Sequence, residues 1–287
     1  MAQSSDHLRP EIRALLGRPK EERKAAIAKR GYVAYPKAHE ALEIMERLCS
    51  IGESTGMLIC GAPGTGKSTL FEVFLKRHPQ TSSADSERVP VLQVQTPEVP
   101  DRRRFLGAVL EAFGFDNYLR DSFESRRLRV IKELKGTGVR LILVDEIHNL
   151  LAGSSKQLEG VGNLLKSLTN PPFEIPIVLA GTDRAMNVFR YDGQLLRRFP
   201  IFELPVWGDC EEYRDFLRRV EQTLPLPQPS ELRADEKANY LLKQSKGITG
   251  DIIRASKEAA IRAVGEDAEM ITLEHLKKSR FRSQYTI

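Results

Sequence analysis

The strongest chemical signal in the chain is a phosphate-binding loop, which reads Gly61-Ala62-Pro63-Gly64-Thr65-Gly66-Lys67-Ser68. It matches the pattern G-x-x-x-x-G-K-[S/T] in full, an apolar run leads into it, and a helical pattern that begins at Thr69 leads out. Glycines let the backbone curl so that its N–H groups point at phosphate oxygens, and the helix dipole adds to this attraction. We expect residues 61–69 to bind ATP, with Lys67 at the β- and γ-phosphates and Ser68 on Mg²⁺. The alternative is a glycine-rich turn with an exposed lysine.

An acidic pair follows another apolar run, 78 residues after Lys67. The run Leu141–Val144 ends in Asp145 and Glu146, and active groups belong at the carboxyl ends of strands in open α/β sheets. We expect Asp145 to hold Mg²⁺, mostly through water, and Glu146 to polarise the attacking water as general base. The pair could instead begin a helix as its N-cap.

The same acidic pair opens the string Asp145-Glu146-Ile147-His148, which spells the DExH signature of helicases. A helicase would need a second domain of the same kind with its own arginines, and this chain has no room for one. We therefore expect His148 to have an ordinary core or surface role, and the functional alternatives are that it packs behind the site or couples the nucleotide state to a partner.

A polar residue and two arginines near the last strands are candidates for completing the site. Thr182 follows the apolar run that ends at Ala180 and could orient the attacking water, although it could instead cap the next helix, a task for which Asp183 competes. Arg197 and Arg198 have no carboxylate at near spacing on their C-terminal side. We expect Arg198, with Arg197 as the alternate, to reach the γ-phosphate of a neighbouring subunit. The alternative for both arginines is that they lie on the surface and only contribute to solubility.

The elements that must position these groups alternate between short apolar runs and helical patterns. We expect strands at 57–60, 89–95, 140–144, 175–180 and 201–204, and helices at 67–78, 102–113, 122–135 and 158–169. This alternation predicts an α/β fold with a parallel sheet and flanking helices. After Trp207 only helices are expected, at 209–224, 235–246, 251–264 and 272–280. We therefore expect a basic helical arm at 1–30, a nucleotide-binding α/β domain at 31–207 and a helical lid with a basic tail at 208–287.

The lid pattern contains one candidate for a phosphate contact. Arg254 lies about one turn into the helix that Gly247–Arg254 opens, and it could reach the phosphates. The alternative is a surface pair with Glu258 at the i+4 position.

Composition sets the broad class and points to a polyanionic partner. The 287 residues are 41% hydrophobic and 29% charged, as in ordinary globular chains. No apolar run reaches the ~18 residues that span a bilayer, and the three cysteines form no disulfide framework, so we expect a cytoplasmic protein without membrane contact. The net charge is +5, and Arg9–Arg30 holds 8 basic and 3 acidic residues, while Asp101–Arg140 holds 10 and 6. Such clustering of basic residues is typical of nucleic-acid binders, although solvated helix faces would give the same pattern.

From about Tyr32 to Val264 the chain resembles the AAA+ ATPases, and within them the TniB/TnsC transposition regulators. Besides the phosphate-binding motifs, the similar segments are Tyr32-Val33-Ala34-Tyr35-Pro36, Val178-Leu179-Ala180-Gly181-Thr182-Asp183-Arg184 and Gln194-Leu195-Leu196-Arg197-Arg198-Phe199. The resemblance implies a P-loop AAA+ (ASCE) sheet with flanking helices and a small C-terminal helical lid. In one respect the chain departs from AAA+ proteins. Their lid often carries Gly-x-x-Arg, whereas the interval from Gly250 to Arg254 is one residue longer.

The resemblance also implies a function. Val33 and Tyr35 would flank the adenine, and the chain would assemble on double-stranded DNA as an ATP-dependent ring or filament. It would recruit a DDE-type transposase (TniA/TnsB-like), with or without a TniQ-like adaptor, and disassemble on hydrolysis. The residues at the family's DNA-contacting positions are Arg102, Arg103, Arg104, Arg120, Arg126 and Arg127. The rival hypotheses are an ATPase motor or scaffold without a DNA role, a replication initiator or loader, and a small-molecule kinase.

Overall fold

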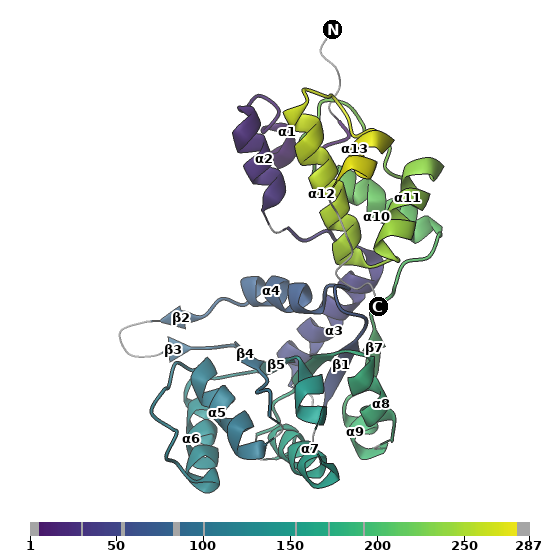
Figure 1. Cartoon of the computed structure of the whole chain (residues 1–287). Helices are drawn as coiled ribbons and strands as arrows, with labels where there is room; N and C mark the ends of the chain where they lie inside the picture. Colours follow the sequence, from purple (N-terminus) through teal and green to yellow (C-terminus); the bar gives the residue numbers. More distant parts are fainter. Residues whose placement is uncertain are drawn as a thin grey trace. The chain divides into compact units, whose positions relative to one another are not determined.

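The computed structural model describes residues 6–29, 31–52, 55–82, 87–99, 101–152, 154–171, 173–191 and 193–279. Its contacts divide the chain into two compact units, shown in Figure 1. Unit 1 comprises Met1–Lys37, Pro63–Gly66 and Pro205–Ile287, and unit 2 comprises Ala38–Ala62 and Lys67–Leu204. The N-terminal arm therefore groups with the lid, and the expected domain division stays a prediction. The expected basic tail from residue 280 onward lies outside the described residues.

Unit 2 is built on a five-stranded parallel sheet in the order β4-β5-β6-β1-β7. The strands are β1 (Gly56–Cys60), β4 (Val91–Gln95), β5 (Leu141–Asp145), β6 (Ile177–Gly181) and β7 (Ile201–Glu203). Each begins and ends within two residues of its predicted range. Strand β6 lies between β1 and β5, so the chain segments that follow these three strands emerge at one edge of the sheet. That edge carries the predicted site residues.

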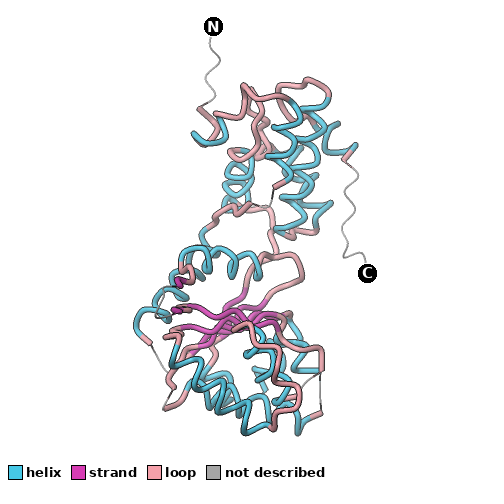
Figure 2. Tube along the Cα trace, turned by 90° about the vertical axis from the view of Figure 1, so that its left-hand side faces the viewer, coloured by secondary structure: helices cyan, strands magenta, loops and turns pink. Residues whose placement is uncertain are grey.

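Helices cover both faces of this sheet (Figures 1 and 2). They are α3 (Pro36–Ile51), α4 (Lys67–Arg77), α5 (Arg102–Ala112), α6 (Phe123–Gly136), α7 (Ser155–Thr169), α8 (Asp183–Tyr191) and α9 (Gly193–Arg198). Successive strand residues point to opposite faces, so Ile142 and Val144 join the apolar core under α5–α9. Leu141 and Leu143 are equally buried on the face of α3 and α4. None of the described helices combines the length and apolarity needed to cross a membrane.

Several short elements of unit 2 were not predicted, among them helix α9. A two-stranded antiparallel sheet forms from β2 (Thr81–Ser82) and β3 (Glu87–Arg88). A 3₁₀ helix, η1 (Ile147–Ala152), begins directly after Glu146. These pieces are too short to leave a periodic pattern in the sequence.

Unit 1 is helical, as predicted for the lid. It contains α1 (Pro10–Arg13), α2 (Lys20–Ala28), α10 (Glu211–Glu221), α11 (Asp235–Ser245), α12 (Thr249–Gly265) and α13 (Leu273–Lys278). Helix α2 packs along α12 and buries Ile27. Polar contacts fix it further: Arg23 Nη2 donates to the Pro225 carbonyl at 2.6 Å, and Lys20 pairs with Asp267 at 2.5 Å. Some of the basic side chains of the N-terminal arm are therefore paired with groups inside unit 1.

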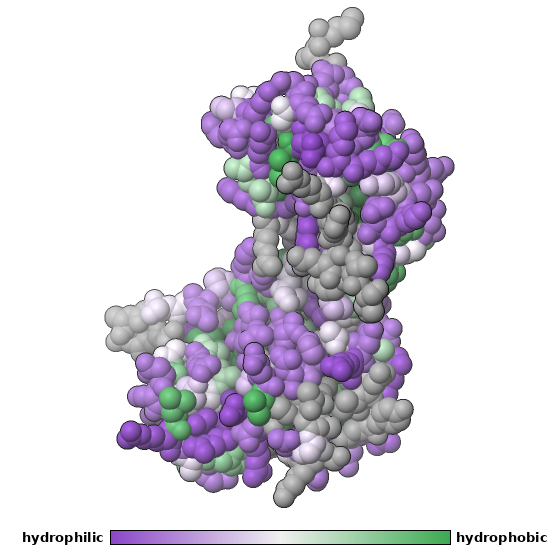
Figure 3. Space-filling view, viewed as in Figure 1, coloured by the Kyte–Doolittle hydropathy of each residue, from purple (hydrophilic) through white to green (hydrophobic). Residues whose placement is uncertain are grey.

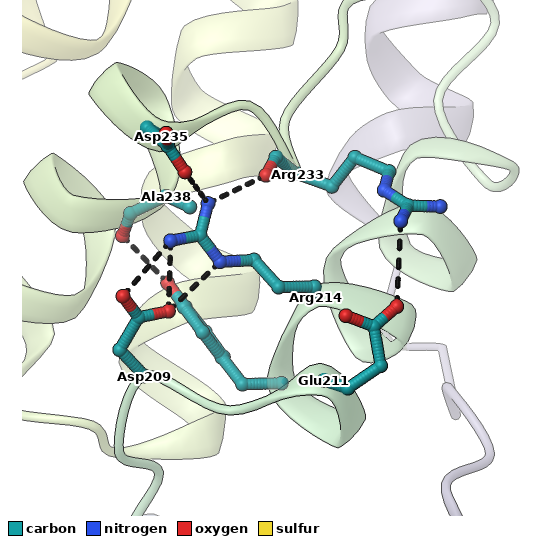
Figure 4. A network of polar contacts seen from close by, with 7 residues as sticks. Asp209, Glu211, Arg214, Arg233, Asp235 and Ala238 are labelled. Carbon is teal, nitrogen blue, oxygen red and sulfur yellow. Dashed lines mark hydrogen bonds and ion pairs between the residues drawn. The ribbon is translucent and has the colours of Figure 1, made fainter.

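An arginine network ties α10 to the start of α11 (Figure 4). Both Nε and Nη2 of Arg214 donate to the Asp209 carboxylate, at 2.8 and 2.9 Å. Nη1 of Arg214 donates to the Arg233 carbonyl at 2.7 Å and pairs with Asp235 at 3.0 Å. The bidentate pair with Asp209 is the geometry that makes such contacts strong. The network orients α10 relative to α11 within unit 1.

The stability of unit 1 depends on a buried carboxylate at the end of α10. Glu221 is 8% exposed, and its oxygens accept the backbone N–H groups of Ser230, Glu231 and Leu232 at 2.7, 3.2 and 2.9 Å. Glu221→Ala would leave these donors unpaired, so we expect a loss of about 3 kcal/mol in the free energy of unfolding. Urea denaturation followed by fluorescence of the single tryptophan, Trp207, measures this loss.

The matched control for this prediction is Glu212→Ala on the same helix, where the side chain is exposed. It should change the free energy of unfolding by less than about 0.5 kcal/mol. Equal denaturation midpoints for the two variants would show that the Glu221 contacts do not stabilise the lid.

Candidate functional site

The phosphate-binding loop joins β1 to α4, as the sequence predicts. Gly64 and Gly66 have positive φ angles of 82° and 104°, a region that favours glycine. Helix α4 begins at Lys67, so the loop ends on the N-terminus of a helix. This is the strand–loop–helix context that a phosphate site requires.

Lys67 is held inside the loop. Its side chain is 8% exposed, and Nζ donates to the carbonyls of Gly61 at 2.8 Å and Ala62 at 3.0 Å. Burial lowers the pKa of Lys67, and the nearby Glu146 and Asp145 carboxylates partly oppose this shift. A buried ammonium with neutral carbonyl partners is electrostatically under-compensated. Anionic phosphate oxygens would supply the missing charge.

The acidic pair lies at the end of β5. Asp145 is buried, and its Oδ1 accepts the Glu146 N–H at 2.9 Å. Glu146 has φ of +57°, a left-handed conformation that is uncommon for residues other than glycine. Such strain clusters at functional sites. The alternative of a simple helix cap does not explain this conformation.

Thr96 supports the acidic pair and was missed by the sequence analysis. It follows β4, is 5% exposed, and its hydroxyl lies 2.9 Å from the Asp145 carbonyl and 2.7 Å from the Glu146 carbonyl. It therefore stabilises the backbone turn that carries both carboxylates. The signal available in the sequence was that this threonine directly follows the strand predicted at 89–95, which lies next to β5 in the sheet.

Thr182 follows β6, between the strands that lead to Lys67 and Asp145. Its hydroxyl is buried and has no hydrogen-bond partner among the described residues. The Thr182 carbonyl, by contrast, accepts the Ala185 N–H at 2.9 Å in the first turn of α8. An N-capping hydroxyl would accept a helix N–H. The unpartnered hydroxyl fits the proposed contact with water or phosphate better than the capping role.

The donor set fits Mg²⁺. Ser68 is exposed at the start of α4, and Asp145 ends β5. Hydroxyl and carboxylate oxygens are the ligands that Mg²⁺ prefers, completed by water and substrate phosphates. Among the described residues no three His, Cys, Asp or Glu side chains gather to hold a metal ion on their own. A Mg²⁺ ion at this place would therefore share its coordination with the nucleotide.

The two candidate trans arginines differ in their surroundings. Arg198 is half-buried, and its Nη1 donates to Thr169 Oγ1 at 3.1 Å and to Asn170 Oδ1 at 2.6 Å. These contacts fasten α9 to the end of α7. Arg197 is exposed. The structure therefore favours Arg197, the alternate, as the arginine that could extend to a neighbour.

The residues predicted to contact adenine lie in unit 1. Val33 and Tyr35 are both 5% exposed. The Tyr35 ring packs edge-on against Trp207 at 5.2 Å and Phe216 at 5.7 Å, and burial raises its pKa to about 12. Trp207 in turn donates from Nε1 to Thr249 Oγ1 at 3.0 Å. Tyr35 is thus part of the core of unit 1, and its proposed contact with adenine stays a prediction.

The predicted lid contact, Arg254, is exposed on α12. At the start of this helix the Gly250 N–H donates to the Gly64 carbonyl at 2.9 Å, within unit 1. A Cβ on Gly250 would lie 2.9 Å from that oxygen, so only glycine allows the approach. The role of Arg254 at the phosphates stays a prediction.

The six arginines predicted to contact DNA are placed on α5, on the loop after it and on α6, but not all are available. Arg126 is 5% exposed, donates to the Arg103 and Leu119 carbonyls and stacks on Tyr118. It is a structural residue, and we remove it from the proposed DNA surface. Arg103 is exposed but braces the loop through the Asp121 carbonyl at 2.6 Å.

The other four arginines remain candidates, and we call them the arginine surface: Arg102, Arg104, Arg120 and Arg127. Arg102 lies over the Phe123 ring at 4.5 Å, and Arg127 approaches Glu124 at 3.5 Å. Figure 3 shows strongly hydrophilic side chains over α5 and α6 at the lower left, with small apolar patches among them. Leu119 and Leu128, 74% and 62% exposed, belong to this region.

The strand order and the groups at the ends of β1, β5 and β6 define a P-loop ATPase fold of the AAA+ class. A family model described as "Bacterial TniB protein" matches residues 23–209, more than half of the chain. The chain therefore belongs to the TniB family. This confirms the resemblance that the sequence motifs carry.

Solved structures share the fold at low identity. The ORC2 protein of Aeropyrum pernix has a TM-score of 0.61 and 19% identity, with 88% of this chain and 70% of that chain covered. The ORC1 protein of the same organism, solved in complex with DNA, has a TM-score of 0.58 and 16% identity, with 90% and 68% covered. Among curated proteins, the ClpL subunit of Lactococcus lactis subsp. lactis is 23% identical over 146 residues, 50% of this chain and 17% of ClpL. The chain thus spans about a sixth of the length of the curated relatives it matches.

Proposed function

We propose that this chain hydrolyses ATP and regulates DNA transposition by binding double-stranded DNA in an ATP-dependent way. One observation carries the proposal: in a chain of the TniB family, Lys67, the acidic pair and the buried hydroxyl of Thr182 follow adjacent strands of one sheet. Groups at this edge are placed to meet the phosphates of one nucleotide.

The proposed reaction is attack of water on the γ-phosphorus. Lys67 binds phosphate oxygens, and Thr182 orients the water. Glu146 accepts the water proton while the new P–O bond forms and the bond to the bridging oxygen breaks, giving ADP and phosphate. Ser68 and Asp145 would hold Mg²⁺, whose charge offsets that of the phosphates.

Assembly is proposed to depend on the nucleotide. An exposed arginine of one subunit that reaches the γ-phosphate of the next would favour the assembled state only with ATP bound. Arg197 suits this role because it is exposed, whereas Arg198 is hydrogen-bonded to α7. Rings or helical filaments on DNA would then recruit a DDE-type transposase, with or without a TniQ-like adaptor, and come apart after hydrolysis.

DNA binding is proposed to use the arginine surface. The fold neighbour ORC1 is described in complex with DNA, which supports a DNA partner for this fold. Contacts from these arginines to phosphates would be largely independent of sequence and strongly dependent on salt. The basic N-terminal arm is a weaker candidate, because Lys20 and Arg23 have partners inside unit 1.

Reversing two charges of the arginine surface tests this role. Arg104→Glu combined with Arg120→Glu should weaken binding of duplex DNA in the presence of an ATP analogue by about tenfold to 100-fold. The slope of log K against log salt should also become shallower by about 2, since each phosphate contact contributes about 0.9. Fluorescence anisotropy over a salt series measures both quantities.

The control for this experiment is Arg47→Glu on α3, an exposed arginine on the other face of the sheet. It should lower the affinity less and leave the salt slope close to that of the wild type. DNA binding by the wild type with no dependence on the arginine surface would place the DNA elsewhere. No DNA binding at all would favour the scaffold or motor hypothesis.

A further inference from the structure

The catalytic carboxylate has a neighbour that the proposed reaction does not use. His148 Nδ1 lies 3.1 Å from Glu146 Oε2. The imidazole nitrogen is fully buried and is within ion-pair distance of the carboxylate without the alignment of a hydrogen bond. The Glu146 side chain is 42% exposed, so only part of it is covered.

The backbone of Glu146 is fixed without any help from His148. Thr96 anchors the carbonyls of Asp145 and Glu146, and Asp145 Oδ1 accepts the Glu146 N–H. The remaining freedom at Glu146 is therefore rotation of its side chain. His148 lies against the carboxylate at the end of this side chain.

The backbone around His148 is well anchored. It lies in η1, where the Asn149 N–H donates to the Glu146 carbonyl at 2.9 Å. The same helix packs against β6 and α8, and Ile147 is fully buried. An imidazole carried by an anchored backbone next to a carboxylate side chain biases which rotamer of that side chain is populated.

We propose that His148 is a positioning residue that holds the Glu146 carboxylate away from the attacking water and so restrains ATP hydrolysis. A general base must turn one oxygen to the water at hydrogen-bond distance. When the Glu146 carboxylate contacts the imidazole, its oxygens are turned away from the attacking water. Because this contact lacks the alignment of a hydrogen bond, it is weak, and the carboxylate can exchange it for a contact with the water. This inference rests on the proposed ATP hydrolysis.

Removing the imidazole tests the restraint. In the full chain, His148→Ala should raise kcat for ATP by about threefold to fivefold, because a partly exposed pair shifts a two-state balance by no more than about fivefold. KM for ATP should stay within about twofold, since the carboxylate rotamer affects the chemical step more than binding. A merely structural role would lower kcat instead. Phosphate release over a series of ATP concentrations separates the two constants.

Two further variants make the result specific. His148→Asn places an amide nitrogen near the position of Nδ1 and should return kcat to within about twofold of the wild type. His39→Ala removes the exposed pair of His39 with Glu43 on α3 and should leave kcat unchanged. Thermal melting followed by circular dichroism confirms that each variant is folded.

The outcomes distinguish this inference from the function on which it rests. If the wild type hydrolyses ATP and His148→Ala has an equal or lower kcat, the restraint is refuted and the proposed function stands. If His148→Asn is as fast as His148→Ala, the contact with Glu146 is not the cause. If neither wild type nor variant hydrolyses ATP, the proposed function itself fails.

Discussion

Replacing Lys67 with alanine is expected to weaken ATP binding by at least about 100-fold, because a charged contact to the phosphates is lost from a buried site. The protein without nucleotide should be nearly as stable as the wild type. Burial lowers the pKa of Lys67, so holding the charged ammonium there costs free energy, and we expect the relief of this cost to offset the two lost bonds to carbonyls.

Thermal melting with and without ATP and Mg²⁺ measures both the loss of ATP binding and the stability of the protein without nucleotide. The wild type should melt at a higher temperature with ATP, since a ligand that binds only the folded state stabilises it. Lys67→Ala should lose this shift, and Lys76→Ala, an exposed lysine at the end of the same helix, should keep it. A full ATP-induced shift in Lys67→Ala would show that the loop does not bind the nucleotide.

Glu146→Gln is expected to slow ATP hydrolysis by about 100-fold to 10,000-fold while leaving ATP binding intact. Glutamine has the same shape and can still contact His148, but it does not accept the water proton. ATP-bound assemblies should therefore live longer on DNA than those of the wild type. Single-turnover hydrolysis measures the first effect, and dissociation from labelled duplex DNA measures the second.

The control for this variant is Glu43→Gln, an exposed carboxylate on α3 whose loss should leave both rates unchanged. Hydrolysis at the wild-type rate in Glu146→Gln would mean that Glu146 is not the general base. Slow hydrolysis together with short-lived DNA complexes would show that disassembly does not depend on hydrolysis.

The parallel sheet was predictable because buried strands leave continuous apolar runs, and each motif follows one of them. The aliphatic side chains of residues 141–144 predict a strand at 140–144, and in the structure this strand runs over Leu141–Asp145. The lid helices were equally clear, since their apolar positions follow a helical period.

Contacts between residues far apart in the sequence were not predictable. The sequence shows that Arg126 and Arg198 are basic, but not that Arg126 donates to the Arg103 carbonyl or that Arg198 donates to Asn170 at the end of α7. Packing of α2 along α12 brings together segments about 230 residues apart, as the Lys257 contact with the Lys29 carbonyl illustrates. Periodicity identifies the buried face of a helix and not its partner.

The central claim is ATP-dependent assembly on DNA, and electron microscopy tests it most directly. The full chain, wild type and Lys67→Ala, would be imaged in negative stain with linear duplex DNA, with and without a non-hydrolysable ATP analogue. We expect regular rings or filaments on DNA for the wild type with the analogue, and none without it or with Lys67→Ala. Assemblies that form equally without nucleotide, or rings that ignore DNA, would contradict the account.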